Sequence, residues 1–340
     1  MCLPRQSKPS FQYYSLARVL FKIVKETLMW FKNIHLFRFI KPFTLSAEQF
    51  NQQLATQPFV KCGKLELVST GWVAPFKNAE VEEPVLVHAA NNCLLFALRK
   101  QEKILPATVI NEHLQEKITE LEELQQRRIR KKERDALKDE VIQDLLPRAF
   151  ARSHVMSAYI DVARGWLIID TASRKKAEEF ANTLRKTLGS LPVVFPKLVN
   201  APATVMTEWL TQQTYPDDFS LADACELADA DNEGAVLNCK RQNLLSEELQ
   251  GHFTAGKMVT QIALQWQEQL GFVMTEEFIL KRLQFLEAFQ EQAKQEAGDD
   301  AAQRFDSDFV LMSGLFASLL ERVFTAFGGE NEAAYQQFMV

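Results

Sequence analysis

The amino-acid sequence predicts an α+β protein with mixed sheets and packed helices, from which a long helical arm protrudes. Two observations predict this fold class. Residues 158–195 follow a strand–strand–helix–strand order, which is typical of an α+β sandwich with helices on one face. Residues 106–152 contain no glycine and no proline between Pro106 and Pro147, which indicates helix over nearly the whole stretch.

The chain opens with a segment that differs from the rest. Residues 1–28 carry five basic residues, one acidic residue and an amphipathic apolar pattern. Such a segment is typical either of a helix on a membrane surface or of an extension upstream of the fold. A fold-like pattern begins at Met29, so we favour an extension that is not part of the fold.

The pattern after Met29 predicts a small α+β region over residues 29–105. Alternation predicts a strand over 30–41, and Ser46 is a suitable N-cap for a helix over 46–55. Further strands are expected at 65–72, 85–88 and 93–99. The last of these is almost continuously apolar, as in a central strand, and Gly71 is expected to turn the chain.

The arm, residues 106–152, is expected to fold as a hairpin near 130–135. Apolar residues at helical spacing occupy its two ends: Val109, Leu114, Ile118, Leu121 and Leu124 in the first, and Leu137, Val141 and Leu145 in the second. Between Leu124 and Leu137 only Ile129 and Ala136 are apolar. The ends are therefore expected to pack and the middle to remain exposed.

The middle of the arm is strongly basic. Six basic residues and one acidic residue fall within residues 127–134, and the basic ones are Arg127, Arg128, Arg130, Lys131, Lys132 and Arg134. Helical spacing predicts one stripe for Arg127, Lys131 and Arg134, continued by Lys138. The ordinary alternative is a solvated helix with pairs such as Glu123–Arg127, worth a few tenths of a kcal/mol. One acid cannot neutralise six bases, so an anion-binding arm is favoured.

An aromatic residue follows the arm between two bases. Phe150 stands between Arg148 and Arg152, just after Pro147. It is suited either to stacking on a nucleic-acid base or to the start of a buried strand. The basic neighbours favour the first interpretation narrowly. Arg148 and Phe150 are therefore predicted to contact DNA together with the six bases of the arm.

The second half of the chain is expected to form a region over 153–200 and another over 201–340. A hairpin turning at Ala163–Gly165, a helix over 174–188 ending at Gly189 and a short strand at 191–195 make up the first. In the second, strands are expected at 234–239, 258–266 and 271–274, a helix begins at Ser246, and residues 305–327 show strong helical spacing. That last helix packs either in the core or on a second subunit.

Charge is divided unevenly along the sequence. The formal net charge is −5, but residues 1–152 carry 24 basic and 17 acidic residues, whereas residues 153–340 carry 15 and 27. Residues 198–239 contain eight acids and no base, and Lys240 and Arg241 follow directly. This isolated pair is also predicted to contact DNA, because local field matters more for contact than net charge.

Other site classes find little support. The five cysteines form no CxxC pair, as expected for reduced thiols in a cytoplasm, and no apolar run reaches the roughly 18–20 residues of a membrane span. No zinc, phosphate-loop, dinucleotide or serine-hydrolase motif occurs. The acid pairs Asp217–Asp218 and Asp299–Asp300 leave an enzymatic alternative, a magnesium-dependent nuclease or DNA-repair enzyme. We expect no catalysis, metal or cofactor.

Several collinear blocks resemble the RdgC family of recombination-associated proteins over about residues 29–330. They are Met29–Asn33, Gly71–Val73, Lys103–Pro106, Leu137–Val141, Leu145–Phe150, Lys175–Glu178, Leu188–Val194, Thr207–Trp209 and Ala302–Asp306. The resemblance implies a cytoplasmic, nucleoid-associated protein that binds duplex and single-stranded DNA with little sequence preference. It further implies a ring-shaped homodimer that encircles DNA and limits RecA-promoted strand exchange. Residues 1–28 depart from the family pattern.

Overall fold

The computed structural model describes residues 30–76, 85–229, 235–296, 298 and 300–336. Twelve strands in these ranges form one sheet whose main path is β2-β4-β5-β6-β1-β12-β11-β10-β8-β9, with β3 beside β4 and β7 beside β1. The strands are β1 (Asn33–Phe39), β2 (Val68–Val73), β3 (Val87–Ala90), β4 (Cys93–Lys103), β5 (Ala151–Asp161), β6 (Trp166–Ile169), β7 (Val193–Val194), β8 (Phe219–Asp229), β9 (Val236–Lys240), β10 (Lys257–Trp266), β11 (Leu270–Thr275) and β12 (Leu280–Phe285). Every pair of these named strands is antiparallel, so the expectation of mixed sheets is wrong.

The N-terminal half of the sheet is covered on both faces. Side chains alternate along β4: Leu94, Phe96 and Leu98 join one apolar core, whereas Cys93 and Leu95 join another. Helices α2 (Ala47–Leu54) and α5 (Arg174–Leu188) pack on the first face, and α9 (Ala301–Ala326) packs on the second. The predicted sandwich with helices on one face is therefore corrected to a sheet covered on both.

The C-terminal half continues the same sheet through β1. Strands β12, β11, β10 and β8 share a core with α9, α6 (Pro202–Thr211), α7 (Glu247–Thr254) and α8 (Glu287–Glu296). A short helix, α10 (Ala333–Gln336), follows α9. Because α9 contributes to the core of both halves, it belongs to the core rather than to a free subunit interface.

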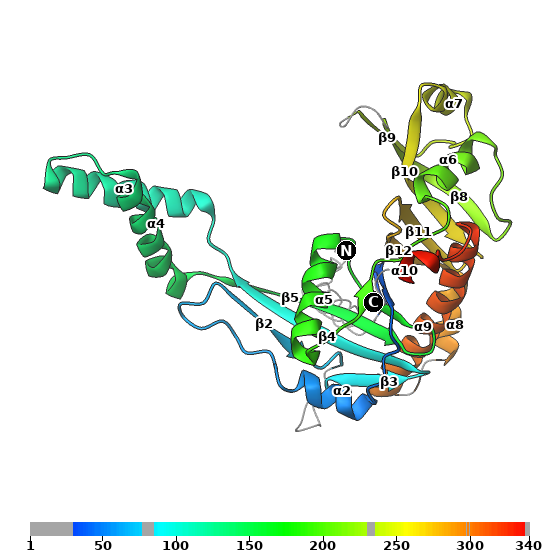
Figure 1. The fold of residues 1–340 in the computed structure, drawn as a ribbon, viewed down its shortest axis with the longest axis horizontal. Helices are drawn as coiled ribbons and strands as arrows, with labels where there is room; N and C mark the ends of the chain where they lie inside the picture. The colour runs from blue at the N-terminus through cyan, green and yellow to red at the C-terminus, as the bar shows by residue number, and fades with distance from the viewer. Residues whose placement is uncertain (1–29, 77–84, 230–234, 297, 299, 337–340) are drawn as a thin grey trace, which may run out of the picture.

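The arm leaves the body at the end of the N-terminal half, as Figure 1 shows. It consists of α3 (Ala107–Gln125) and α4 (Lys131–Leu145), followed by a 3-10 turn at Leu146–Arg148. Its small core is separate from the two cores of the body. The predicted protruding helical hairpin is confirmed, with its turn a few residues earlier than expected.

Local signals in the sequence locate several elements well. Ser46 caps α2 by accepting a hydrogen bond from the backbone N–H of Gln49, and α5 ends at Gly189 with φ of 76°. The expected turn at Gly71 is wrong, because Gly71 lies inside β2. A Cβ there would stand 2.4 Å from Cα of Phe59, so glycine is needed for close approach of this neighbouring segment.

Candidate nucleic-acid interface

The arm is held together by a small apolar core and a cross-helix ion pair. Leu114 and Ile118 of α3 meet Val141 of α4, and all three are buried. Lys117 of α3 reaches α4, with its Nζ 2.8 Å from a carboxylate oxygen of Asp144. A second carboxylate of α4, that of Glu140, lies 3.2 Å from the same nitrogen. These contacts fix the hairpin and so fix the position of its tip.

Only part of the expected apolar stripe is used. Ile110, which the stripe did not include, packs against the arm core. Leu124, which the stripe did include, is 74% exposed. Leu124 lies in the last turn of α3, which ends at Gln125, and the chain departs through Gln126 with φ of 51°.

At the tip, Glu133 organises the turn between the two helices. Its carboxylate accepts hydrogen bonds from Arg127 at 2.7 and 2.9 Å and from the backbone N–H of Arg130 at 2.9 Å. The hydrogen bond from Arg127 is the largest cause that lowers the pKa of Glu133 to about 2. The one acid of the basic segment thus serves as a cap for α4, which reserves Arg127 for a structural role.

The remaining bases of the segment are exposed, and none of them has an ion-pair partner within 4 Å among the residues that the structure describes. These are Arg128, Arg130, Lys131, Lys132 and Arg134. The predicted stripe needs one correction. Arg127 lies in the turn, so only Lys131, Arg134 and Lys138 share a helical face on α4.

The base of the arm exposes apolar side chains. Phe150 is 86% exposed, so the alternative of a core phenylalanine is wrong. Its carbonyl accepts a hydrogen bond from the N–H of Ile104 at 2.7 Å, while the N–H of Lys103 donates to the carbonyl of Leu67 at 2.8 Å. Ile104 is 48% exposed and Leu67 49% exposed. We call Leu67, Ile104 and Phe150 the arm-base patch.

The other predicted bases lie elsewhere. Arg148 is exposed in the 3-10 turn beside the arm-base patch. Lys240 ends β9 and Arg241 follows it with φ of 57°, both exposed. Figure 1 shows β9 at the upper right, far from the arm at the left, so one chain does not bring these two basic groups together.

Two of the four acids suggested as metal ligands, Asp218 and Asp300, have other partners. Asp218 accepts hydrogen bonds from Arg322 at 2.7 and 2.9 Å and from the indole N–H of Trp266 at 3.1 Å. Asp300 caps α9 by accepting from the N–H of Gln303 at 2.8 Å, whereas Asp299 lies outside the described residues. Within the part of the chain that the structure covers, no three His, Cys, Asp or Glu side chains are grouped to hold a metal ion.

One described helix, α9, is long and apolar enough to cross a membrane by length and composition alone. Half of its most apolar window is buried inside the protein. The core packing described above accounts for this apolar character.

Fold and site together define an antiparallel α+β protein with an exposed basic helical hairpin. Residues 29–330 match the family described as "Putative exonuclease, RdgC". The chain belongs to the RdgC family, as its resemblance blocks predict. Residues 1–28 lie outside that match and outside the described residues, so their status as an extension stays a prediction.

Three relatives are similar over nearly their whole length, and each is named "Recombination-associated protein RdgC". Those from Pseudomonas putida strain GB-1 and Pseudomonas entomophila strain L48 are 44% identical over 303 and 304 residues. The one from Pseudomonas aeruginosa strain UCBPP-PA14 is 43% identical over 303 residues. In all three cases the similarity covers 89% of this chain and 98% of the relative.

Proposed function

We propose that the protein binds duplex and single-stranded DNA with little sequence preference, encloses it as a ring-shaped homodimer and thereby limits RecA-promoted recombination. The observation that carries the proposal is the arm tip, where five exposed bases have no ion-pair partner in the described part of the chain. Clustered cations at the end of a projecting element are suited to phosphate contact, which is independent of sequence.

Two features support enclosure by two copies. Figure 1 shows the arm at one end and the C-terminal half rising at the other, which leaves an open concave side between them. Two such chains with their concave sides facing would surround a hole. Leu67 and Ile104 of the arm-base patch offer exposed apolar surface for one of the two contacts that a closed ring needs, and Phe150 beside them stays available to DNA.

Enclosure also gives a physical route to control of recombination. A duplex inside a closed ring cannot leave sideways, so modest phosphate contacts give a long residence. DNA held in this way is withheld from a RecA filament. This proposal places the protein on the nucleoid in the cytoplasm, and the relatives' printed name, "Recombination-associated protein", agrees with that role.

A salt titration tests the phosphate contacts. Log affinity for duplex should fall linearly with log salt, and Arg128→Ala, Lys132→Ala and Arg134→Ala together should reduce the slope by about three, one per lost contact. The control removes three exposed body lysines, Lys41, Lys61 and Lys294, and so changes net charge equally. Equal slopes for the two triple variants would refute the arm as the DNA contact.

The second candidate function is that of a metal-dependent nuclease, which the family description favours. Incubation of the purified protein with linear duplex and Mg²⁺ tests it directly. We expect the DNA to stay intact. Degradation that EDTA abolishes would support the nuclease and would overturn the non-catalytic proposal.

A further inference from the structure

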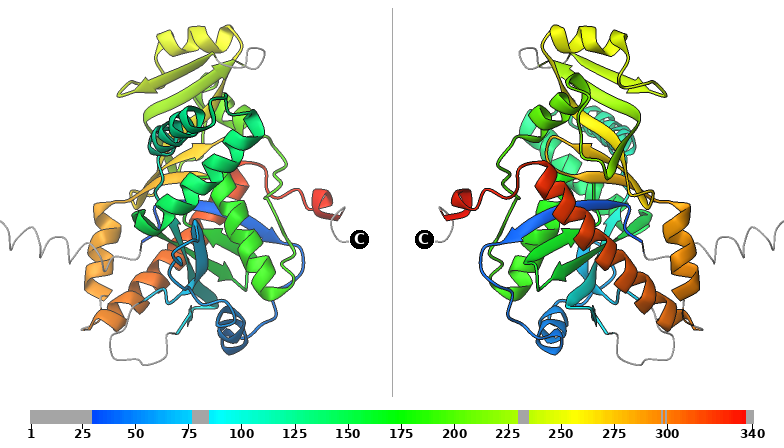
Figure 2. Two further views of the ribbon diagram at one scale, coloured as in Figure 1. Left: turned by 90° about the vertical axis from the view of Figure 1, so that its left-hand side faces the viewer. Right: turned by 90° about the vertical axis from the view of Figure 1, so that its right-hand side faces the viewer.

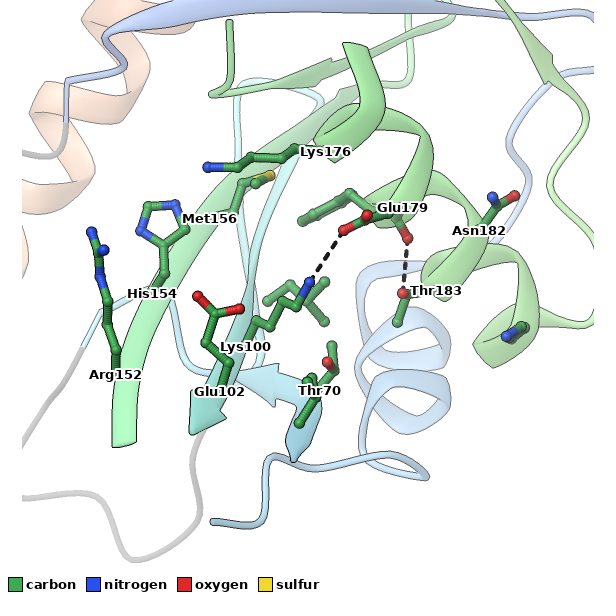
Figure 3. A pocket seen from close by; sticks show the side chains of 14 residues that line it. Thr70, Lys100, Glu102, Arg152, His154, Met156, Lys176, Glu179, Asn182 and Thr183 are labelled. Atoms are coloured by element: carbon green, nitrogen blue, oxygen red, sulfur yellow. Dashed lines mark hydrogen bonds and ion pairs between the residues drawn. The ribbon is translucent and has the colours of Figure 1, made fainter. Parts of the chain in front are cut away.

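A groove opens on the sheet face that carries α5, at the end nearest the arm. Its volume is about 550 Å³, and it lies between α5 and the ends of β2, β4 and β5. The three strands extend beyond α5 toward the arm, as Figure 1 shows, so this end of the face has no helix over it. Figure 3 shows side chains from β4, β5 and α5 converging on the groove.

The strand register explains which side chains line the groove floor. Leu98 pairs with Met156, Lys100 with His154, and Glu102 with Arg152, all on the face that α5 covers farther along. The floor is therefore apolar under α5 and becomes charged toward the arm.

One face of α5 forms the wall of the groove. Lys176, Glu179, Thr183 and Lys186 follow helical spacing and line the groove together. Glu179 approaches Lys100, with their charged atoms 3.3 Å apart, and this pair ties the wall to the floor.

The charge that remains is positive. With the Lys100–Glu179 pair set aside, the lining carries Arg152, Lys176 and Lys186 against Glu102. None of the three bases has an ion-pair partner within 4 Å in the described ranges of the chain. An anion with an apolar, flat part fits such a lining, because the cations hold the anion and the floor accepts the flat part.

Strand β5 continues this lining out of the groove. Along β5, Arg152, His154 and Met156 alternate onto the face that lines the groove. Phe150 directly precedes β5, is 86% exposed and stands two positions before Arg152 in the same alternation. Exposed aromatic side chains beside a basic groove are the platform on which unpaired bases stack. The volume suits one or two nucleotides, whereas a duplex, whose major groove alone is about 12 Å wide, cannot enter.

We propose that the groove between α5 and β5 binds an unpaired DNA strand, which enters past Phe150 and places its phosphates on Arg152, Lys176 and Lys186. The inference rests on the proposed function, because it assigns to the single strand a site distinct from the arm tip that contacts duplex. It accounts for two binding modes in one protein: phosphates of the duplex at the arm and unpaired bases in the groove.

The test uses the full chain and two matched double variants on the same helix. Lys176→Ala with Lys186→Ala removes two groove cations, whereas Lys175→Ala with Arg185→Ala removes two exposed neighbours outside the groove. Binding to fluorescein-labelled (dT)8 and to a mixed-sequence duplex is measured against salt. The groove variant should bind (dT)8 about tenfold more weakly with a salt slope lower by about 1.4, and the control variant should match wild type.

Duplex affinity should change less than twofold in either variant, and equal melting temperatures establish that both are folded. The groove is not a single-strand site if both double variants weaken the binding of (dT)8 equally. The same holds if the groove variant weakens the binding of duplex and of (dT)8 alike. Such results leave the arm proposal intact, provided that wild type binds duplex. Failure of wild type to bind either DNA would instead reject both proposals. Photocrosslinking of (dT)8 carrying one 5-iodouracil should label Phe150 or His154, and labelling confined to helices α3 and α4 would also overturn the inference.

Discussion

At the residue scale, substitution of Phe150 tests a function of the surface without disturbing the core. Its side chain is 86% exposed at the arm-base patch, so Phe150→Ser should change the free energy of unfolding by well under 1 kcal/mol. The same change should weaken DNA binding or lower the dimer mass in solution. A buried control, Phe96→Ser, should instead destabilise the protein by about 3–5 kcal/mol or more.

Urea melts, light scattering and gel shifts on the two Phe variants measure these effects. If Phe150→Ser retains both wild-type DNA affinity and wild-type mass, the patch has no part in binding or assembly.

His35 gives the fold a pH dependence. Burial, and secondarily the charge of Arg174, lowers the pKa of His35 to about 4 in the folded protein. Its Nδ1 has no hydrogen-bond partner among the described residues. The unfolded chain therefore binds the proton first as pH falls, and stability is lost between about 6.5 and 4, by about 3 kcal/mol.

Urea unfolding at intervals between pH 7 and 4 checks this dependence. His35→Leu replaces the titrating group with an apolar side chain. The free energy of unfolding of this variant should therefore fall by about 3 kcal/mol less than that of the wild type over the same pH range. Parallel curves for the two proteins would mean that another group controls acid sensitivity.

At the element scale, the arm is expected to unfold independently of the body. Its core rests on Leu114, Ile118 and Val141 and shares no buried residue with the two body cores. Leu114→Ala should lower the free energy of unfolding of the arm by about 2–5 kcal/mol, which is a large loss for so small a core. The helices α3 and α4 should then open locally and DNA affinity should fall.

Hydrogen exchange distinguishes local from global effects. Amides of 107–145 should exchange faster in Leu114→Ala, while those of β4 stay protected. The matched control is Leu124→Ala in the same helix, whose side chain is 74% exposed and which should leave exchange unchanged. Equal acceleration in arm and body would contradict an independently stable arm.

At the scale of the whole molecule, α9 joins the two halves of the sheet. Phe316 is fully buried and its ring lies 6.3 Å from that of Phe31, next to β1, and 6.1 Å from that of Phe285 in β12. Figure 2 shows α9 running diagonally across the sheet, which agrees with its place in the larger core. The halves should therefore unfold together.

Phe316→Ala tests this coupling. The substitution should lower the free energy of unfolding by about 3–5 kcal/mol. It should also accelerate amide hydrogen exchange in β4 and β10 by the same factor, because both strands belong to one cooperative unit. Selective loss of protection in β10 would show that the halves are separately stable.

Local rules in the sequence determined the elements with strong signals. Ser46 and Gly189 mark helix ends because capping depends on the adjacent backbone. The long stretch without glycine or proline marks the arm because a helix continues where no residue nearby interrupts it. The collinear blocks that resemble the RdgC family also determined the family, because such a match depends on the order of residues along the chain and not on how the chain folds. Elements without such local signals, β8 and β12, were not predicted, because their residues become strands through pairing with β10 and β11.

How the functional side chains are used follows from the three-dimensional fold. The fold paired Arg127 with Glu133, left the neighbouring bases without an ion-pair partner among the described residues and placed Phe150 on the surface. It also brought Arg152 of β5 and Lys176 of α5 to one groove, which no spacing in the sequence indicates. The physical reason is that ion pairs, exposure and grooves depend on the path that the chain takes in space, as at the turn that brings Arg127 to Glu133 and at the packing of α5 on β5. Helix ends and periodicity depend instead on neighbours along the chain.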